Sequence, residues 1–71
     1  MIGGRDYTGY ALDQMQGRGV TPTLVEDAIQ NGTSRPDKNF PDSRTEHTSP
    51  DGRTVVITDS GSGRVITVLS R

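Results

Sequence analysis

The chain has 71 residues, a formal net charge of −1 at neutral pH, one histidine and no cysteine. A chain of this length buries only about 60% of its unfolded surface, so residues 1–71 are expected to form a single domain with a small core. The composition excludes disulfide cross-links, thiolate metal sites and multi-histidine metal sites, and the near-neutral charge argues against nonspecific coating of nucleic acid.

Residues 1–6, MIGGRD, are expected to be flexible or to be a segment added in front of a folded fragment. The longest apolar run in the chain covers only residues 55–57. The sequence therefore predicts neither a signal peptide nor a transmembrane helix.

The first predicted helix lies within residues 7–19, YTGYALDQMQGRG. Thr8 suits the N-cap, because its hydroxyl can accept a hydrogen bond from a free N–H group of the first turn. Ala11, Leu12 and Met15 cluster on one side of this helix, which should face the core.

A row of polar side chains borders that apolar side. Tyr10, Gln14 and Arg18 follow one another at intervals of four residues, so a hydroxyl, an amide and a guanidinium share one rim. The simpler interpretation is a solvated helix edge with the Tyr10 ring packed on the core. The alternative is one wall of a cleft that recognises phosphate.

A second helix is predicted to start at Thr21, an N-cap followed by proline, and to stop at Gly32. Two short helices joined by a tight turn cannot bury both apolar faces against each other, so they need a sheet. Residues 33–42 are polar and contain two prolines, which predicts a connecting loop anchored by Phe40. Lys38 in this loop is either a solvated charge or a contact to phosphate.

Three strands are predicted in the second half of the chain, at residues 43–49, 53–59 and 64–70. The turn sequences PDG and SGSG between them favour an antiparallel meander. The apolar last strand is expected to be central or covered on much of both faces, and the polar first strand to lie at an edge. The predicted fold is α+β, with two N-terminal helices packed on a three- to four-stranded antiparallel sheet.

The sequence lacks the patterns of several common catalytic sites. It has no pair of ligands at metal-binding spacing, no glycine-rich loop between a strand and a helix, and no nucleophile-elbow motif. Metal-free RNA cleavage needs fewer protein groups than these reactions, because the 2′-hydroxyl of the substrate is the nucleophile. The protein only moves protons and stabilises charge. No cofactor or metal is expected.

Several side chains suit that reaction. Arg18, Arg44 and Arg64 can supply fixed positive charge to a phosphate. The hydroxyls of Tyr10 and Thr67 can hydrogen-bond the reacting oxygens, although threonine is also common in strands for its β propensity alone.

His47 can transfer a proton near neutral pH. A lone histidine in a strand is, however, more often a surface or packing residue. Glu46 beside it points to the opposite face of the strand, so the two side chains do not form an acid/base pair.

Three segments together resemble a known family: YTGYALDQMQGRGVTP, LVEDAIQNG and VVITDSGSGRVITV. They are similar to the C-terminal toxin domains of bacterial polymorphic toxins, the contact-dependent growth inhibition and Rhs-type effectors. The nuclease domains of these effectors fall in the barnase, EndoU, colicin and RelE-like (BECR-like) group. The resemblance implies a small metal-independent ribonuclease, often aimed at tRNA. It also implies secretion or cell-surface delivery by the producing cell as part of a larger effector, action in the cytoplasm of the target cell, and neutralisation by a cognate immunity protein.

In that family the first helix usually reads G-H-A-L-D-Q-M, and its histidine is expected to be catalytic. Tyr10 stands at that position here, whereas Arg18 and Thr67 match the family. The chain is then either a natural variant that uses Tyr10 or His47 instead, or a weakened form. Tyrosine, with an ordinary pKa of about 10, is a poor base at neutral pH, so activity is expected to be low if it is the only substitute.

The expected site is a cleft between the first helix and the exposed sheet face. Its expected lining is Tyr10, Gln14, Arg18, Arg44, His47 and Thr67, with Lys38 and Arg64 as further RNA contacts. The alternative function is a non-enzymatic protein-binding module, such as an inactive toxin remnant or an antitoxin-like partner. In that case a partner strand is expected to add along the edge at residues 45–48.

Overall fold

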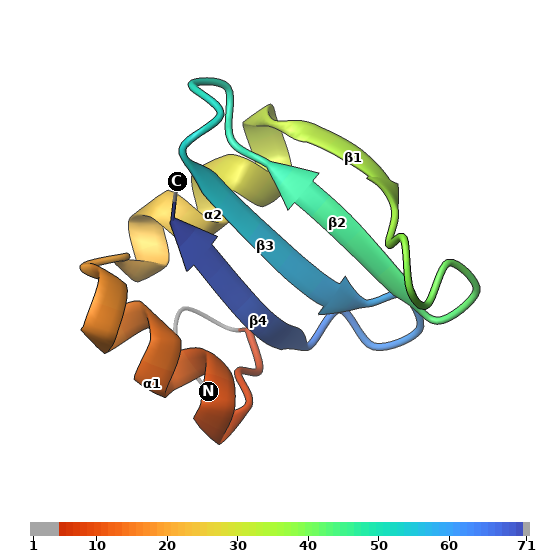
Figure 1. The fold of residues 1–71 in the computed structure, drawn as a ribbon, viewed down its shortest axis with the longest axis horizontal. Helices are drawn as coiled ribbons and strands as arrows, with labels where there is room; N and C mark the ends of the chain where they lie inside the picture. The colour runs from red at the N-terminus through yellow and green to blue at the C-terminus, as the bar shows by residue number, and fades with distance from the viewer. Residues whose placement is uncertain (1–4, 71) are drawn as a thin grey trace.

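The computed structural model describes residues 5–70 as a four-stranded antiparallel sheet with two helices (Figure 1). The predicted α+β class is confirmed. The strands lie in the order β1-β2-β3-β4, and each pairs with its neighbour in the sequence. The elements are α1 (Gly9–Arg18), α2 (Pro22–Asn31), β1 (Thr33–Pro36), β2 (Arg44–Thr48), β3 (Thr54–Asp59) and β4 (Val65–Ser70).

Both helices begin at the caps that the sequence predicts. The Thr8 hydroxyl accepts a hydrogen bond from the backbone N–H of Ala11 at 3.0 Å, and the Thr21 hydroxyl accepts one from Leu24 at 3.3 Å. Gly19 ends α1 in the left-handed region, with φ of 68°. Because these signals are local, the sequence locates both helices well.

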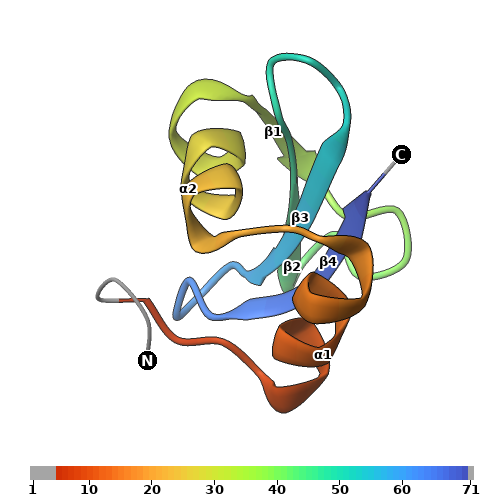
Figure 2. The same ribbon diagram turned by 90° about the vertical axis from the view of Figure 1, so that its left-hand side faces the viewer.

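The helices occupy different places around the sheet. Helix α2 packs on one face of the sheet, chiefly against β3, while α1 lies along β4 (Figure 2). Val56 and Val68 pair across β3 and β4 and are fully buried beneath the helices. They belong to a single core cluster, which also contains Ala11, Met15, Val20, Val25, Ala28 and Val65.

The first correction concerns residues 33–36, which were expected to be loop. They form β1, which pairs antiparallel with β2 in the register Thr33↔Thr48. All four residues of β1 are exposed, so no apolar alternation marks the strand. Its backbone bonds to β2 stabilise it, and Pro36 is tolerated because it ends an edge strand.

The second correction concerns the order of the strands. The polar strand β2 is internal, because β1 covers its outer edge, and the apolar strand β4 is the last in the sheet. The edge of β4 is partly covered by the N-terminal segment: the Val65 N–H donates to the Asp6 carbonyl at 2.8 Å, and the Thr8 N–H donates to the Val65 carbonyl at 3.0 Å. Tyr7 and Val65 form an isolated parallel β-bridge.

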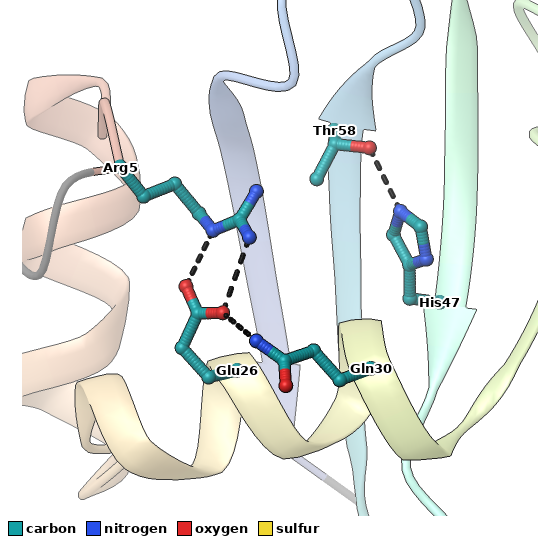
Figure 3. Close-up of polar contacts among 5 residues, drawn as sticks. All are labelled: Arg5, Glu26, Gln30, His47 and Thr58. Carbon is teal, nitrogen blue, oxygen red and sulfur yellow. Dashed lines mark hydrogen bonds and ion pairs between the residues drawn. The ribbon is translucent and has the colours of Figure 1, made fainter.

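The third correction concerns the segment expected to be flexible, of which residues 1–4 lie outside the described part. Arg5 and Asp6 are held in place. Arg5 forms a bidentate ion pair with Glu26 on α2, and Gln30 donates a further hydrogen bond to Glu26 Oε2 at 3.0 Å (Figure 3). The Arg5 guanidinium holds the pKa of Glu26 below its ordinary value. This pair attaches the start of the described chain to α2.

Among residues 5–70, neither helix has the length and apolar character needed to cross a bilayer.

Candidate functional site on the helix-free face of the sheet

Alternation along the strands separates two sets of side chains. We call one surface the helix-covered face, which carries His47, Val56, Thr58, Val65 and Val68, and the other the helix-free face, which carries Arg44, Glu46, Ile57, Thr67 and Leu69. Figure 1 looks onto the helix-free face, with α2 behind the sheet. Cross-strand pairing places Glu46 beside Ile57 and Ile57 beside Thr67.

A pocket of about 300 Å³ opens on the helix-free face. Strand residues form its floor, and the loop of residues 37–43 between β1 and β2 forms its wall. Its lining residues are Asp37, Lys38, Asn39, Phe40, Arg44, Glu46, Ile57, Thr67 and Leu69.

The wall of the pocket is fixed by its own hydrogen bonds. The Asp37 carboxylate accepts from the backbone N–H groups of Asn39 at 3.3 Å and Phe40 at 3.0 Å. The backbone N–H of Asp37 donates to the Arg44 carbonyl at 3.1 Å, and that of Arg44 donates to the Phe40 carbonyl at 2.9 Å. The loop backbone is therefore tied to the start of β2 beside the pocket.

The charges in the pocket differ in how they are engaged. Glu46, whose side chain is only 12% exposed, forms an ion pair with Arg35 through Oε1 and Nε at 2.6 Å. The Arg44 guanidinium lies 4.3 Å from the centre of the Phe40 ring, a cation–π contact. Within residues 5–70, neither Arg44 nor Lys38 forms an ion pair with a carboxylate. Two cations are thus available to an anionic ligand.

No family model, curated protein or solved structure matches this chain. The chemistry of the pocket and the sequence resemblance therefore carry the functional inference.

Of the residues expected at the site, Lys38, Arg44 and Thr67 come together in this pocket. They lie far apart in the sequence. Lys38 reaches the pocket from the loop, Arg44 from the start of β2 and Thr67 from the middle of β4.

The polar rim of α1 does not line the pocket. Arg18 Nε instead donates to Gln14 Oε1 at 2.6 Å on the exposed side of the helix, and Tyr10 is 60% exposed. Arg64, just before β4, is also exposed and lies 4.0 Å from the Asp6 carboxylate. The single cleft expected to combine α1 with the sheet is therefore not present in this form.

His47 lies on the other face from Arg44 and Thr67, which corrects its expected place in that cleft. Its Nε2 is 2.9 Å from the Thr58 hydroxyl (Figure 3). Its Nδ1 is 2.8 Å from the Ser34 hydroxyl. Burial lowers the pKa of His47, and the nearby positive charge of Arg5 lowers it further. The imidazole thus lies between two hydroxyls, away from the pocket, where burial favours its neutral form.

Glu46 is the charged strand residue of the pocket that was not among the expected site residues. It was considered only as a partner for His47, and the alternation that separates those two side chains also places Glu46 with Arg44. That signal is present in the sequence SRTEHTS. The involvement of Asn39 and Phe40 was not predictable in this way, because loop closure brings them to the sheet.

Among the described residues, no group of three or more His, Asp or Glu side chains is placed to hold a metal ion.

Proposed function

We propose that this domain is a metal-independent endoribonuclease of the toxin type, with its active site in the pocket on the helix-free face. The observation that carries the proposal is the convergence of Arg44, Glu46 and Thr67 in one pocket, with Lys38 at its wall. Metal-free RNA cleavage requires proton transfer and stabilisation of charge, which a carboxylate, two cations and a hydroxyl can supply.

In the proposed reaction, Glu46 accepts the proton of a ribose 2′-hydroxyl. The 2′ oxygen bonds to phosphorus, the bond from phosphorus to the 5′ oxygen breaks, and water supplies the proton to that leaving oxygen. The products are a 2′,3′-cyclic phosphate and a free 5′-hydroxyl. Arg44 and Lys38 stabilise the charge that develops on the phosphate, and the Thr67 hydroxyl donates to one of its oxygens.

The biological setting of the proposal comes from the family resemblance. It comprises tRNA as the substrate, a target bacterial cell as the place of action, delivery within a larger effector, and a cognate immunity protein as the partner. That partner would block the reaction most directly by covering the pocket. Because the chain is slightly acidic overall, with a net charge of −1, the partner does not need to be strongly acidic.

The test compares the rates at which the unchanged chain and the Glu46→Gln variant cleave total tRNA in the presence of a metal chelator. A general base contributes about 100- to 10,000-fold to a rate, so Glu46→Gln should lose at least 100-fold. Asp13→Asn is the matched control, since Asp13 is an exposed carboxylate on α1. Equal cleavage by Glu46→Gln and Asp13→Asn would remove Glu46 from the mechanism.

A Tyr10→His variant separates this site from one on α1. If only that variant cuts tRNA, catalysis belongs to α1 and the present chain is a weakened enzyme. If neither the unchanged chain nor Tyr10→His cuts tRNA, the nuclease proposal fails.

A second candidate function is a non-enzymatic module that binds a partner by strand addition. The observation in its favour is that β1, and not β2, is the polar edge strand and that all four of its residues are exposed. Under this hypothesis Ser34→Pro, which removes the N–H group that β1 presents at its free edge, weakens binding of the partner protein. Arg44→Ala and Thr67→Ala then leave that binding unchanged, whereas a partner that covers the pocket is weakened by them.

A further inference from the structure

We propose, building on the function proposed above, that the loop of residues 37–43 holds the base of one unpaired nucleotide against Phe40, so that the domain acts on single-stranded RNA and not on duplex. Phe40, Arg44 and the apolar floor of the pocket carry the argument.

The aromatic surface in the pocket is suited to stacking. Phe40 is the only phenylalanine in the chain and remains 49% exposed although it lines a concave pocket. Ile57 and Leu69 give the same pocket an apolar floor. A half-exposed ring in a pocket with apolar side chains is costly to leave in water, and a nucleobase, whose two faces are flat and aromatic, covers it well.

The ring is positioned before binding. The two backbone hydrogen bonds to the Asp37 carboxylate and the bonds that tie the loop to Arg44 fix residues 37–40 in one conformation. The Arg44 guanidinium lies over the ring and restricts it further. A ligand that stacks there therefore loses little free energy in ordering the site.

The charges select a nucleotide over an uncharged aromatic ligand. Within the described residues, the carboxylates of the pocket are engaged, Asp37 by backbone N–H groups and Glu46 by Arg35, whereas Arg44 and Lys38 form no ion pair. A base against Phe40 brings its phosphate within reach of these two cations. The side-chain amide of Asn39, which also lines the pocket, can donate to and accept from the edge of the base.

A paired base cannot use this arrangement, because both of its faces are stacked on its neighbours in a duplex. The base must leave the stack to contact Phe40, which costs a few kcal/mol in a duplex and much less in a single strand. The preference for single strands follows from the concave shape of the pocket.

The experiment uses binding of RNA that cannot be cleaved. A short 2′-O-methyl oligoribonucleotide, alone and annealed to its complement, is titrated into the full chain while amide shifts are recorded by NMR. The single strand should shift the signals of residues 37–44, and the duplex should bind at least 10-fold more weakly. A stacked base contributes about 1–3 kcal/mol, so Phe40→Ala should weaken binding of the single strand about 5- to 150-fold.

Two further variants keep the result interpretable. Phe40→Leu preserves an apolar side chain under Arg44 without an aromatic face and should weaken binding as Phe40→Ala does. Leu24→Ala is the matched control, because Leu24 is an exposed apolar residue on α2, 42% exposed and outside the pocket. Unchanged affinity of both Phe40 variants, or equal affinity for strand and duplex, would overturn the inference. So would tighter binding of a polyglutamate peptide than of the single strand.

The outcome is separable from the fate of the nuclease proposal. The probe has no 2′-hydroxyl, so its binding does not depend on cleavage. Binding at Phe40 without tRNA cleavage would support the base-binding pocket and contradict the nuclease proposal. If Phe40→Ala cleaves tRNA as fast as the unchanged chain does, the nuclease proposal stands and the base-binding pocket is contradicted.

Discussion

The two faces of the sheet are built from the same strands and differ in almost every other respect. On the helix-covered face, valines pack beneath the helices and the one histidine is held between two hydroxyls. On the helix-free face, Arg44, Glu46 and Thr67 surround a pocket that only a loop overhangs. A side chain and its immediate neighbour on one strand thus belong to different environments.

In this small domain, one face of the sheet therefore packs the core, while the other face is available to bind a ligand. If the comparison is right, substitutions on the helix-covered side change stability and leave the proposed activity per folded molecule unchanged. Substitutions at three places on that side test it.

The largest effect is expected from Gly32→Ala. A Cβ atom at Gly32 would overlap the carbonyl oxygens of Thr48 and Ala28, where the end of α2 meets β2. Overpacking of this kind costs about 1–3 kcal/mol, and the rigid backbone on both sides places this variant near the upper end. Urea unfolding followed by circular dichroism measures the loss.

Gly17→Ala is the matched control for that substitution. Nothing lies within 4 Å of a Cβ at Gly17, and the residue is inside α1. Alanine there should stabilise the domain by about 0.5–1 kcal/mol. A Gly32→Ala variant as stable as the unchanged chain would contradict the close packing of α2 against the sheet.

A smaller effect is expected from the ion pair between Arg5 and Glu26, whose side chains are 26% and 30% exposed. A bidentate pair that is partly shielded from water should show a coupling energy of about 1 kcal/mol in a double-mutant cycle of Arg5→Met and Glu26→Gln. The coupling should shrink in concentrated salt. A coupling near zero would show that the N-terminal segment is held by its backbone bonds to β4 alone.

The smallest effect is a pH dependence that His47 produces. Its pKa in the folded protein lies below the ordinary value of 6.5, so the unfolded chain binds more protons as the medium becomes acidic. Stability should therefore fall as the pH drops through about 6.5 and level off below the lowered pKa of the folded state. The carboxylates with lowered pKa values, Glu26, Asp51 and Asp59, lose their contribution only at lower pH.

His47→Gln should flatten the dependence of the urea midpoint between pH 5 and 7, since no other histidine is present. The variant should still cleave tRNA, because the imidazole lies on the helix-covered face. A variant that loses cleavage while remaining folded would return His47 to the active site and break the comparison between the two faces.

The accuracy of the sequence-based predictions followed the range of the interactions involved. Thr8, Thr21 and Gly19 act within one helical turn, so both helices were located correctly. The turns at residues 50–52 and 60–63 likewise joined the expected antiparallel strands. The β1 strand was missed because its four exposed residues show no alternation and only pairing with β2 stabilises it.

The candidate site was predictable in part. Lys38, Arg44 and Thr67 were selected for their chemistry, and the structure brings them together. His47 was grouped with Arg44 although the two are three residues apart on one strand, a spacing that places them on opposite faces. Tyr10, Gln14 and Arg18 do share one side of a helix, but the placement of α1 along β4 keeps that side out of the pocket.

The sequence by itself determined the helices, the main strands and the types of side chain available for chemistry, because caps, turns and periodicity act between near neighbours. The tertiary structure decided which strand lies at the edge, which face of the sheet the helices cover, and which distant residues meet. Those outcomes depend on long-range pairing and packing, whose free energy is shared among residues far apart in the chain. The pocket beside Phe40 is one of them.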